Sequence, residues 1–203
     1  MASGFGLRLV PRAAPYRFTL SPVPPGIDVE RATADRWLFA RIVPESGGYR
    51  SELDEHTASL ADLVDVQPGP DVRQWWAETS RFRIPMLPGW TLQASGEPSA
   101  PIVFDLLGPQ GMLVYVQTPA SLPDLAEMAG PGQQVVASGD GPRSRWVEVR
   151  YVYGGEPWAQ RHHVVQVGSL GLVVTAQSHV TRMAAALRAQ EALVEALAPA
   201  GEA

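Results

Sequence analysis

The feature that most constrains the fold of this chain is a run of three alternating segments in its last third. Residues 145–153 read RWVEVRYVY, residues 159–167 read AQRHHVVQV and residues 170–177 read LGLVVTAQ, with Gly154-Gly155 and Gly168-Ser169 between them. Alternation of apolar and polar residues with a period of two is typical of β-strands that have one buried face. We therefore expect consecutive antiparallel strands joined by tight turns.

Shorter segments of the same kind precede this run, at residues 81–87, 91–95, 101–108, 111–118 and 133–138. Residues 108–111 (GPQG) and 139–142 (GDGP) are expected to form hairpin turns. Ser121 is expected to cap a short helix over residues 121–129, and Ser178 to cap a final helix. The apolar line expected to face the sheet in that final helix comprises Val180, Met183, Ala184, Leu187, Val194 and Leu197.

Strands that alternate with turns and are followed by separate helical blocks predict an α+β fold, in which an antiparallel sheet packs against helices. Residues 1–72 are expected to be an N-terminal extension or small module with strands near residues 16–20 and 36–43 and a helix over 51–64. Residues 67–71 (QPGPD) read as a linker, so residues 73–203 form the α+β sheet domain with its C-terminal helix. Whether residues 1–72 fold independently is left open.

Composition excludes several classes of chemistry. The 203-residue chain contains no cysteine, lysine or asparagine and has a net charge of −5. It therefore has no thiolate nucleophile, zinc ribbon, Schiff-base lysine or P-loop lysine, and its charge disfavours a nucleic-acid partner. No stretch of about 18 uninterrupted apolar residues is present, so we expect no membrane insertion and a cytoplasmic location. No catalytic residue, cofactor or metal ion is assigned.

The adjacent pair His162-His163 is the strongest candidate for a chemical site. Successive side chains on a strand point to opposite faces of the sheet, so the two imidazoles are expected to diverge and cannot chelate one ion. A metal site would need one of them together with distant carboxylates such as Glu148 or Glu156. The interpretation as structural histidines is the more economical one.

A binding face is the sharper alternative to a merely solvated sheet surface. If residues 145–153 pair with 159–167, the face carrying Glu148 and Arg150 could meet His162 or Gln160 across the sheet. Tryptophan, tyrosine and arginine dominate interface hot spots. The pair Trp75-Trp76 is expected to pack the N-terminal region onto the sheet, with exposure to a partner as the alternative. The candidate partner-binding residues are Trp146, Glu148, Arg150, Trp158, His162, Trp75 and Trp76.

From about residue 81 to 198 the order of elements resembles the PsbP-like fold. The resemblance is carried by residues 82–90 (FRIPMLPGW), where a strand runs into a Pro-Gly-Trp turn, by residues 173–177 (VVTAQ) and by the closing helix. That fold includes photosystem II subunits, Ran-binding import factors, mycobacterial lipoproteins and some secretion chaperones. The resemblance implies a non-enzymatic binder. The chain lacks the N-terminal cysteine of the lipoprotein branch.

Three functional hypotheses follow. The first is a non-enzymatic protein-binding adaptor, chaperone or structural component of a bacterial multi-protein assembly such as a secretion system, or an immunity protein that neutralises a toxin. The second is a small-molecule or lipid binder with a pocket between the sheet and the C-terminal helix. The third, a hydrolase or metal enzyme, is disfavoured because it would require Glu148, Glu156, His162 and His179 to converge. The partner's identity and the oligomeric state are left open.

Overall fold

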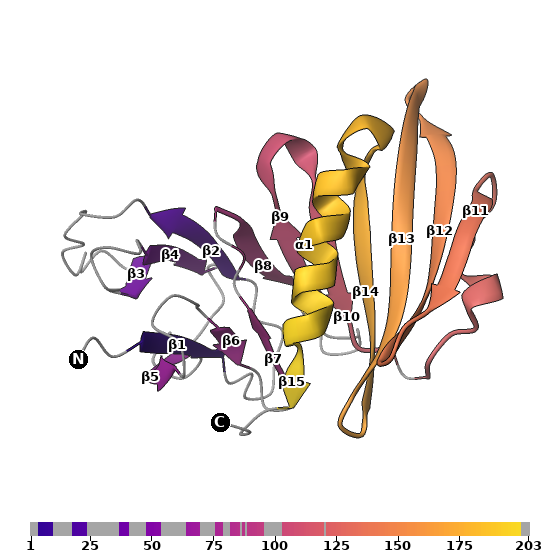
Figure 1. Cartoon of the computed structure of the whole chain (residues 1–203). Coiled ribbons are helices and arrows are strands. Elements are labelled where there is room, and N and C mark those ends of the chain that lie inside the picture. Colours follow the sequence, from indigo (N-terminus) through magenta and orange to yellow (C-terminus); the bar gives the residue numbers. More distant parts are fainter. Residues whose placement is uncertain are drawn as a thin grey trace.

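The computed structural model describes residues 82–85, 87, 89–93, 104–119 and 121–199 in full, and only the backbone of further strand residues. The strands form two sheets. One has ten strands in the order β11-β12-β13-β14-β10-β9-β8-β2-β4-β3, and the other has five in the order β15-β7-β6-β1-β5. Figure 1 shows α1 in front of the larger sheet, alongside β14 and β10.

In the C-terminal half, nine described strands are followed or separated by short 3-10 turns and one described α-helix. The strands are β7 (Phe82–Pro85), β8 (Thr91–Ser95), β9 (Val103–Leu107), β10 (Leu113–Gln117), β11 (Gln134–Asp140), β12 (Ser144–Tyr153), β13 (Glu156–Val167), β14 (Leu170–His179) and β15 (Ala198–Pro199). The helices are the 3-10 turns η2 (Pro109–Gly111), η3 (Leu125–Glu127) and η4 (Val180–Arg182), and the α-helix α1 (Met183–Ala196).

The seven strands from β8 to β14 form a continuous antiparallel sheet made of two meanders. β8, β9 and β10 pair in chain order, and so do β11, β12, β13 and β14. The two meanders join where β10 pairs with β14, which places Leu113 opposite Gln177. The hairpin turn expected at residues 108–111 is confirmed, and the one expected at residues 139–142 lies at residues 141–143, because Gly139 and Asp140 still pair with Trp146 and Arg145. In the first of them Gln110 and Gly111 have φ of 58° and 77°.

The described part of the chain is mainly β, with one α-helix on an antiparallel sheet, which is compatible with the α+β expectation. Residues 183–196 (MAAALRAQEALVEA) are rich in strong helix formers. The helix packs on β14, β10, β13 and β7. The core that it covers contains fully buried Val114, Val174 and Leu193. Burial of each such side chain stabilises the fold by roughly 1.5–3 kcal/mol.

The expected helix boundaries and helix face need correction. Residues 121–129 form only the 3-10 turn η3, which Asp124 rather than Ser121 caps by accepting from the Ala126 amide. Ser178 belongs to β14, and its hydroxyl donates to the His179 carbonyl and the Met183 sulfur, because β14 runs directly into η4. The buried residues of α1 are Met183, Ala186, Gln190, Leu193 and Val194, so Ala184 does not face the sheet.

The N-terminal strands are described by their backbones alone. They are β1 (Gly4–Leu9), β2 (Phe18–Val23), β3 (Trp37–Ala40), β4 (Gly48–Leu53), β5 (Val64–Gly69) and β6 (Trp76–Glu78). β2 pairs with β8 and so extends the larger sheet, while β1 pairs with β6 in the smaller one. The linker expected at residues 67–71 falls partly on β5. Most of the helix expected over residues 51–64 lies outside the described residues, and residues 51–53 are strand.

Candidate functional site

Strands β12, β13 and β14 have two unlike faces. The helix-side face is the one against which α1 packs, and on β13 it carries Ala159, Arg161 and His163. The open face is the opposite one, and on β13 it carries Trp158, Gln160 and His162. The pairing Trp146↔His163 and Val147↔His162 fixes which residues of β12 belong to each face.

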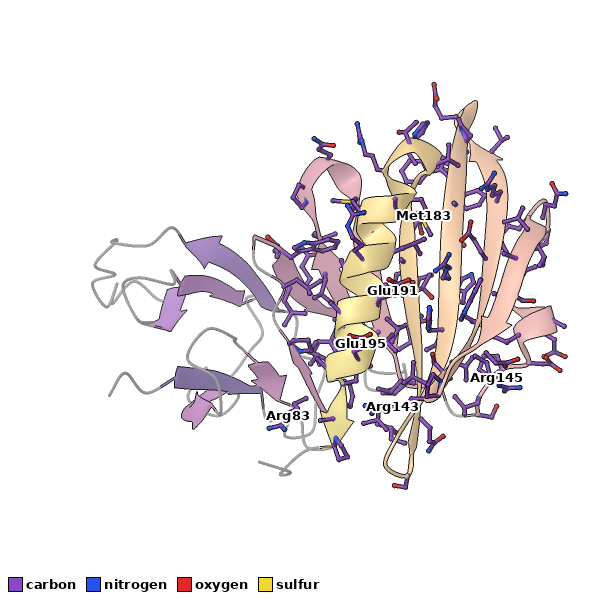
Figure 2. All side chains as sticks on the ribbon, viewed as in Figure 1. Arg83, Arg143, Arg145, Met183, Glu191 and Glu195 are labelled. Atoms are coloured by element: carbon purple, nitrogen blue, oxygen red, sulfur yellow. The ribbon has the colours of Figure 1, made fainter. Side chains whose placement is uncertain are left out.

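An ion-pair network occupies the helix-side face beside α1. Nη2 of Arg161 lies 2.7 Å from Oε2 of Glu148, and its Nη1 lies 3.4 Å from Oε1 of Glu191 on the helix. Cζ of Arg161 lies 4.4 Å from the centre of the Trp146 ring, which also stacks on the His163 ring at 6.3 Å. Figure 2 shows Glu191 on α1. The network ties the sheet to the helix.

Three of the residues expected at a partner surface therefore lie on the helix-side face. Glu148 is 8 % exposed, and Trp146 is half-buried against Arg161. Arg150 is exposed and lies 3.9 Å from Glu148. The suggestion that Glu148 and Arg150 meet His162 or Gln160 across the sheet is wrong, because the register places Glu148 opposite Arg161 and Arg150 opposite Ala159.

The divergence of the two histidines is confirmed. On the open face Nδ1 of His162 lies 2.8 Å from Oγ1 of Thr175, and on the helix-side face Nδ1 of His163 lies 3.2 Å from Oγ of Ser144. Both Nε2 atoms are buried and make no hydrogen bond. Burial lowers the pKa of each imidazole to about 4, and for His163 the nearby Arg161 adds to the effect. Both rings are therefore neutral at pH 7.

A row of polar side chains crosses the open face at one level. Asp105 on β9 lies opposite Tyr115 on β10, which lies opposite Thr175 on β14, which lies opposite His162 on β13. Burial raises the pKa of the Asp105 carboxyl and of the Tyr115 phenol, while a hydrogen bond with Thr175 opposes the shift of the phenol. We call these four residues the polar row.

A second row runs beside it and consists of glutamines. Nε2 of Gln160 donates to Oε1 of Gln177 at 2.8 Å, and Nε2 of Gln133 donates to Oε1 of Gln160 at 3.0 Å. Gln133 belongs to the connection between β10 and β11, so the glutamine row ties that connection to the sheet. Side-chain amide groups of this row can donate hydrogen bonds to a bound group or accept hydrogen bonds from it.

The third row is aromatic and lies toward the turn between β12 and β13. The Tyr153 and Trp158 rings meet edge to face at 6.3 Å, and Trp158 and His179 do the same at 6.4 Å. Tyr153 is 71 % exposed. Nε2 of His179 lies 3.5 Å from a carboxylate oxygen of Glu156. We call Tyr153, Trp158 and His179 the aromatic row.

The connection between β10 and β11 lies against the other end of the open face. The Leu122 side chain occupies the space above Gly171, where a Cβ atom would lie 2.5 Å from it. Beyond the core under α1, Val147, Val149, Val164 and Val173 are buried on the open face. The open face is therefore buried at this end and accessible along the aromatic row.

The sequence indicated Trp158 and His162 as site residues, and the structure places both on the open face. It did not indicate Tyr115, Tyr151, Asp105, Gln133 or Gln177, and it named Gln160 only as a possible neighbour of Glu148 and Arg150. Apart from Gln133, these residues occupy alternate positions of paired strands, a signal that becomes visible only when the register is known. The Trp75 side chain and the Trp76 side chain lie outside the described residues.

The four groups proposed for an enzyme do not converge. Glu148 lies on the helix-side face and His162 on the open face, while Glu156 and His179 form a pair near the β12–β13 turn. Within residues 82–199, as far as they are described, no three His, Cys, Asp or Glu side chains gather in a way that could hold a metal ion. In the same residues, no helix is both long and apolar enough to cross a membrane.

The layer between the sheet and α1, proposed above as a ligand pocket, is occupied by side chains. Met183, Ala186 and Leu193 of the helix are buried in the same cluster as Val174 of the sheet. Gln190 is fully buried among them and donates to the Val174 and Arg161 carbonyls at 2.9 and 2.7 Å. A ligand at this place would have to separate these contacts.

Comparison of the chain with models of known protein families, with curated proteins and with solved structures found no match. The functional assignment consequently depends on the arrangement of the side chains described above.

Proposed function

We propose that the protein is a non-enzymatic protein-binding adaptor or chaperone that holds its partner on the open face of the sheet. The observation that carries the proposal is the exposed aromatic row. Large aromatic side chains at the centre of an interface contribute most of the binding energy in many complexes, and Tyr153 lies open to solvent.

The position of the row supports a binding role more than a role in folding. Tyr153 and Trp158 lie near the turn between β12 and β13, away from the buried valines of the same face. Removal of the Tyr153 ring exposes little new apolar surface, because the ring is 71 % exposed in the folded protein. The exposed Tyr153 ring also contacts Trp158 edge to face, so two aromatic side chains lie together beside the turn.

A capture experiment with matched variants tests the proposal. The tagged protein is used to isolate its partners from its native cells, and the yield of each stoichiometric protein is measured for the wild type, for Tyr153→Ala and for Arg150→Ala. Arg150 is the matched control, because it is exposed on the same strand but belongs to the helix-side face.

We expect Tyr153→Ala to reduce the yield of one partner strongly and Arg150→Ala to leave it unchanged, with both variants as stable as the wild type. A loss of the partner with Arg150→Ala but not with Tyr153→Ala would place the interface on the helix-side face and contradict the proposal. Equal yields from all three proteins, or the absence of any stoichiometric partner, would contradict the proposal.

A further inference from the structure

β11 forms one edge of the larger sheet, and this edge is open to solvent. Among the strands that the structure describes, β11 pairs with β12 alone and lies at one end of the sheet, as Figure 1 shows. On its other side, alternate residues of β11 direct their backbone N–H and C=O groups outward. The side chains of Gln134–Ser138 are exposed, with Val135 at 48 % and Val136 at 41 %. The edge can therefore accept another strand.

β11 lacks most of the features that keep edge strands from pairing with another chain. Such features are lysine or another inward-facing charge, proline and a β-bulge. The strand reads QVVASGD, without proline or a basic residue, and its one charge is Asp140 at its last position. A bulge interrupts the register with β12 between Val135 and Ala137, and the pairing is regular from Ala137 onward. The regular part of the edge is thus short, neutral for most of its length and unprotected.

The helix-side face of this edge is flat and lies beside a large aromatic ring. Ala137 and Gly139 belong to that face, because they pair with Glu148 and Trp146. The Trp146 ring lies over Gly139, where a Cβ atom would come within 2.8 Å of it. The residue that pairs with Gly139 on an added strand must leave room for this ring. A small side chain at that position meets the requirement and still covers part of the indole.

We propose that this edge pairs with the same edge of a second copy of the chain, antiparallel and around a twofold axis at Ser138. In this register Ala137 of each copy lies opposite Gly139 of the other, so a small side chain adjoins each Trp146 ring. Residues that lie opposite one another in a sheet share a face. Ser138 pairs with Val147 and belongs to the open face. Both open faces consequently lie on the same side of the dimer, and the inference stands apart from the proposed function.

Charge and the bulge both favour the axis at Ser138. This axis places Asp140 opposite the uncharged Val136 of the second copy. The two Asp140 residues are then four residues, or about 14 Å, apart along the strands, which exceeds the Debye length of about 8 Å. An axis at Gly139 would halve that separation. An axis at Ala137 would carry the pairing through the bulge, where the alternation of faces is interrupted.

Sedimentation velocity over a range of protein concentrations tests for the dimer. One pair of short strands buries less than the roughly 1,200 Å² of a stable interface, so the association is expected to be weak. We expect the average mass to rise from one chain toward two between about 1 µM and 1 mM, which corresponds to about −8 to −4 kcal/mol. A protein that is still monomeric at about 1 mM would overturn the inference.

Charge-swap variants at Ser138 locate the contact, because the axis places the two Ser138 side chains opposite each other. Ser138→Glu and Ser138→Lys each put two like charges across the axis, and we expect each variant alone to associate about fivefold more weakly. An equimolar mixture of the two variants should regain the wild-type association, because opposite charges then face one another. Ala184→Glu and Ala184→Lys, at an exposed position of α1, are the matched controls and should leave the association unchanged.

A dimer that neither Ser138 variant weakens, or that their mixture does not restore, would place the contact elsewhere and contradict the inference. Amide hydrogen exchange of β11, measured in dilute and in concentrated protein, gives a second reading. We expect alternate amides of β11 to exchange more slowly in the concentrated sample. Protection of these amides only in a complex with a captured partner would assign the edge to that partner. The inference would then fail, while the proposed function would stand.

Discussion

Acidification should destabilise this protein through its two buried histidines, and His162 allows the effect to be measured alone. Burial lowers the pKa of the folded-state imidazole from 6.5 to about 4. As the pH falls below 6.5, the unfolded chain therefore binds a proton that the folded protein does not yet accept. Stability that is fully present above pH 6.5 is lost progressively as the pH falls toward 4.

The size of the effect follows from the pKa difference. One pKa unit corresponds to about 1.4 kcal/mol, so complete titration of His162 changes the free energy of unfolding by on the order of 3 kcal/mol. Between pH 7 and pH 5 about 2 kcal/mol of this is lost. Replacement by glutamine removes the titrating group and keeps an amide that can still hydrogen-bond to Thr175.

The assay is urea unfolding followed by tryptophan fluorescence at a series of pH values, for the wild type and for His162→Gln. We expect the variant to be less stable than the wild type at pH 7. The difference between their free energies of unfolding should be smaller by about 2 kcal/mol at pH 5. His179→Gln, a change at a histidine that contacts Glu156 near the surface, is the control. A difference between wild type and His162→Gln that stays constant with pH would refute the reasoning.

Two further changes test the helix-side face by the same unfolding assay. Gly139→Ala would place a Cβ atom 2.8 Å from the Trp146 ring, and we expect the free energy of unfolding to fall by about 1–3 kcal/mol. Gly141→Ala is the control, because its Cβ approaches nothing closer than 3.4 Å, and it should change the stability little. Equal effects of the two variants would show that the Trp146 ring moves aside freely. Arg161→Met leaves the buried Glu148 carboxylate without its 2.7 Å partner, so we expect a loss of about 3 kcal/mol; an unchanged stability would show that the ion pair is not buried in solution.

Much of the sheet could be predicted from local patterns. The alternation in residues 145–153, 159–167 and 170–177 specified three strands, and glycines located the turns between them. The opposite directions of His162 and His163 followed from the period of two alone. These predictions succeeded because they depend on neighbours in the chain, and the pleat of a strand determines where each side chain points.

The candidate site could not be predicted in the same way. A change of one residue in register exchanges the partners of every side chain on a face, and the sequence contained no signal to place Glu148 opposite Arg161 rather than His162. The polar row spans strands from both meanders, so it requires the pairing of β10 with β14. The resemblance to the PsbP-like fold stays a prediction.

The pairing of β10 with β14, which joins the two meanders, also affects the rate of folding. Each meander forms through hairpins that are local in sequence, but Leu113 of β10 meets Gln177 of β14 only after the whole intervening segment has been enclosed. Closure of such a loop costs chain entropy before any contact compensates it, and long-range pairing of this kind slows folding. α1 packs on both of these strands, so its full docking site does not exist until they meet. We therefore expect the rate-limiting step to be the meeting of β10 and β14, with the helix docking in the same event or after it.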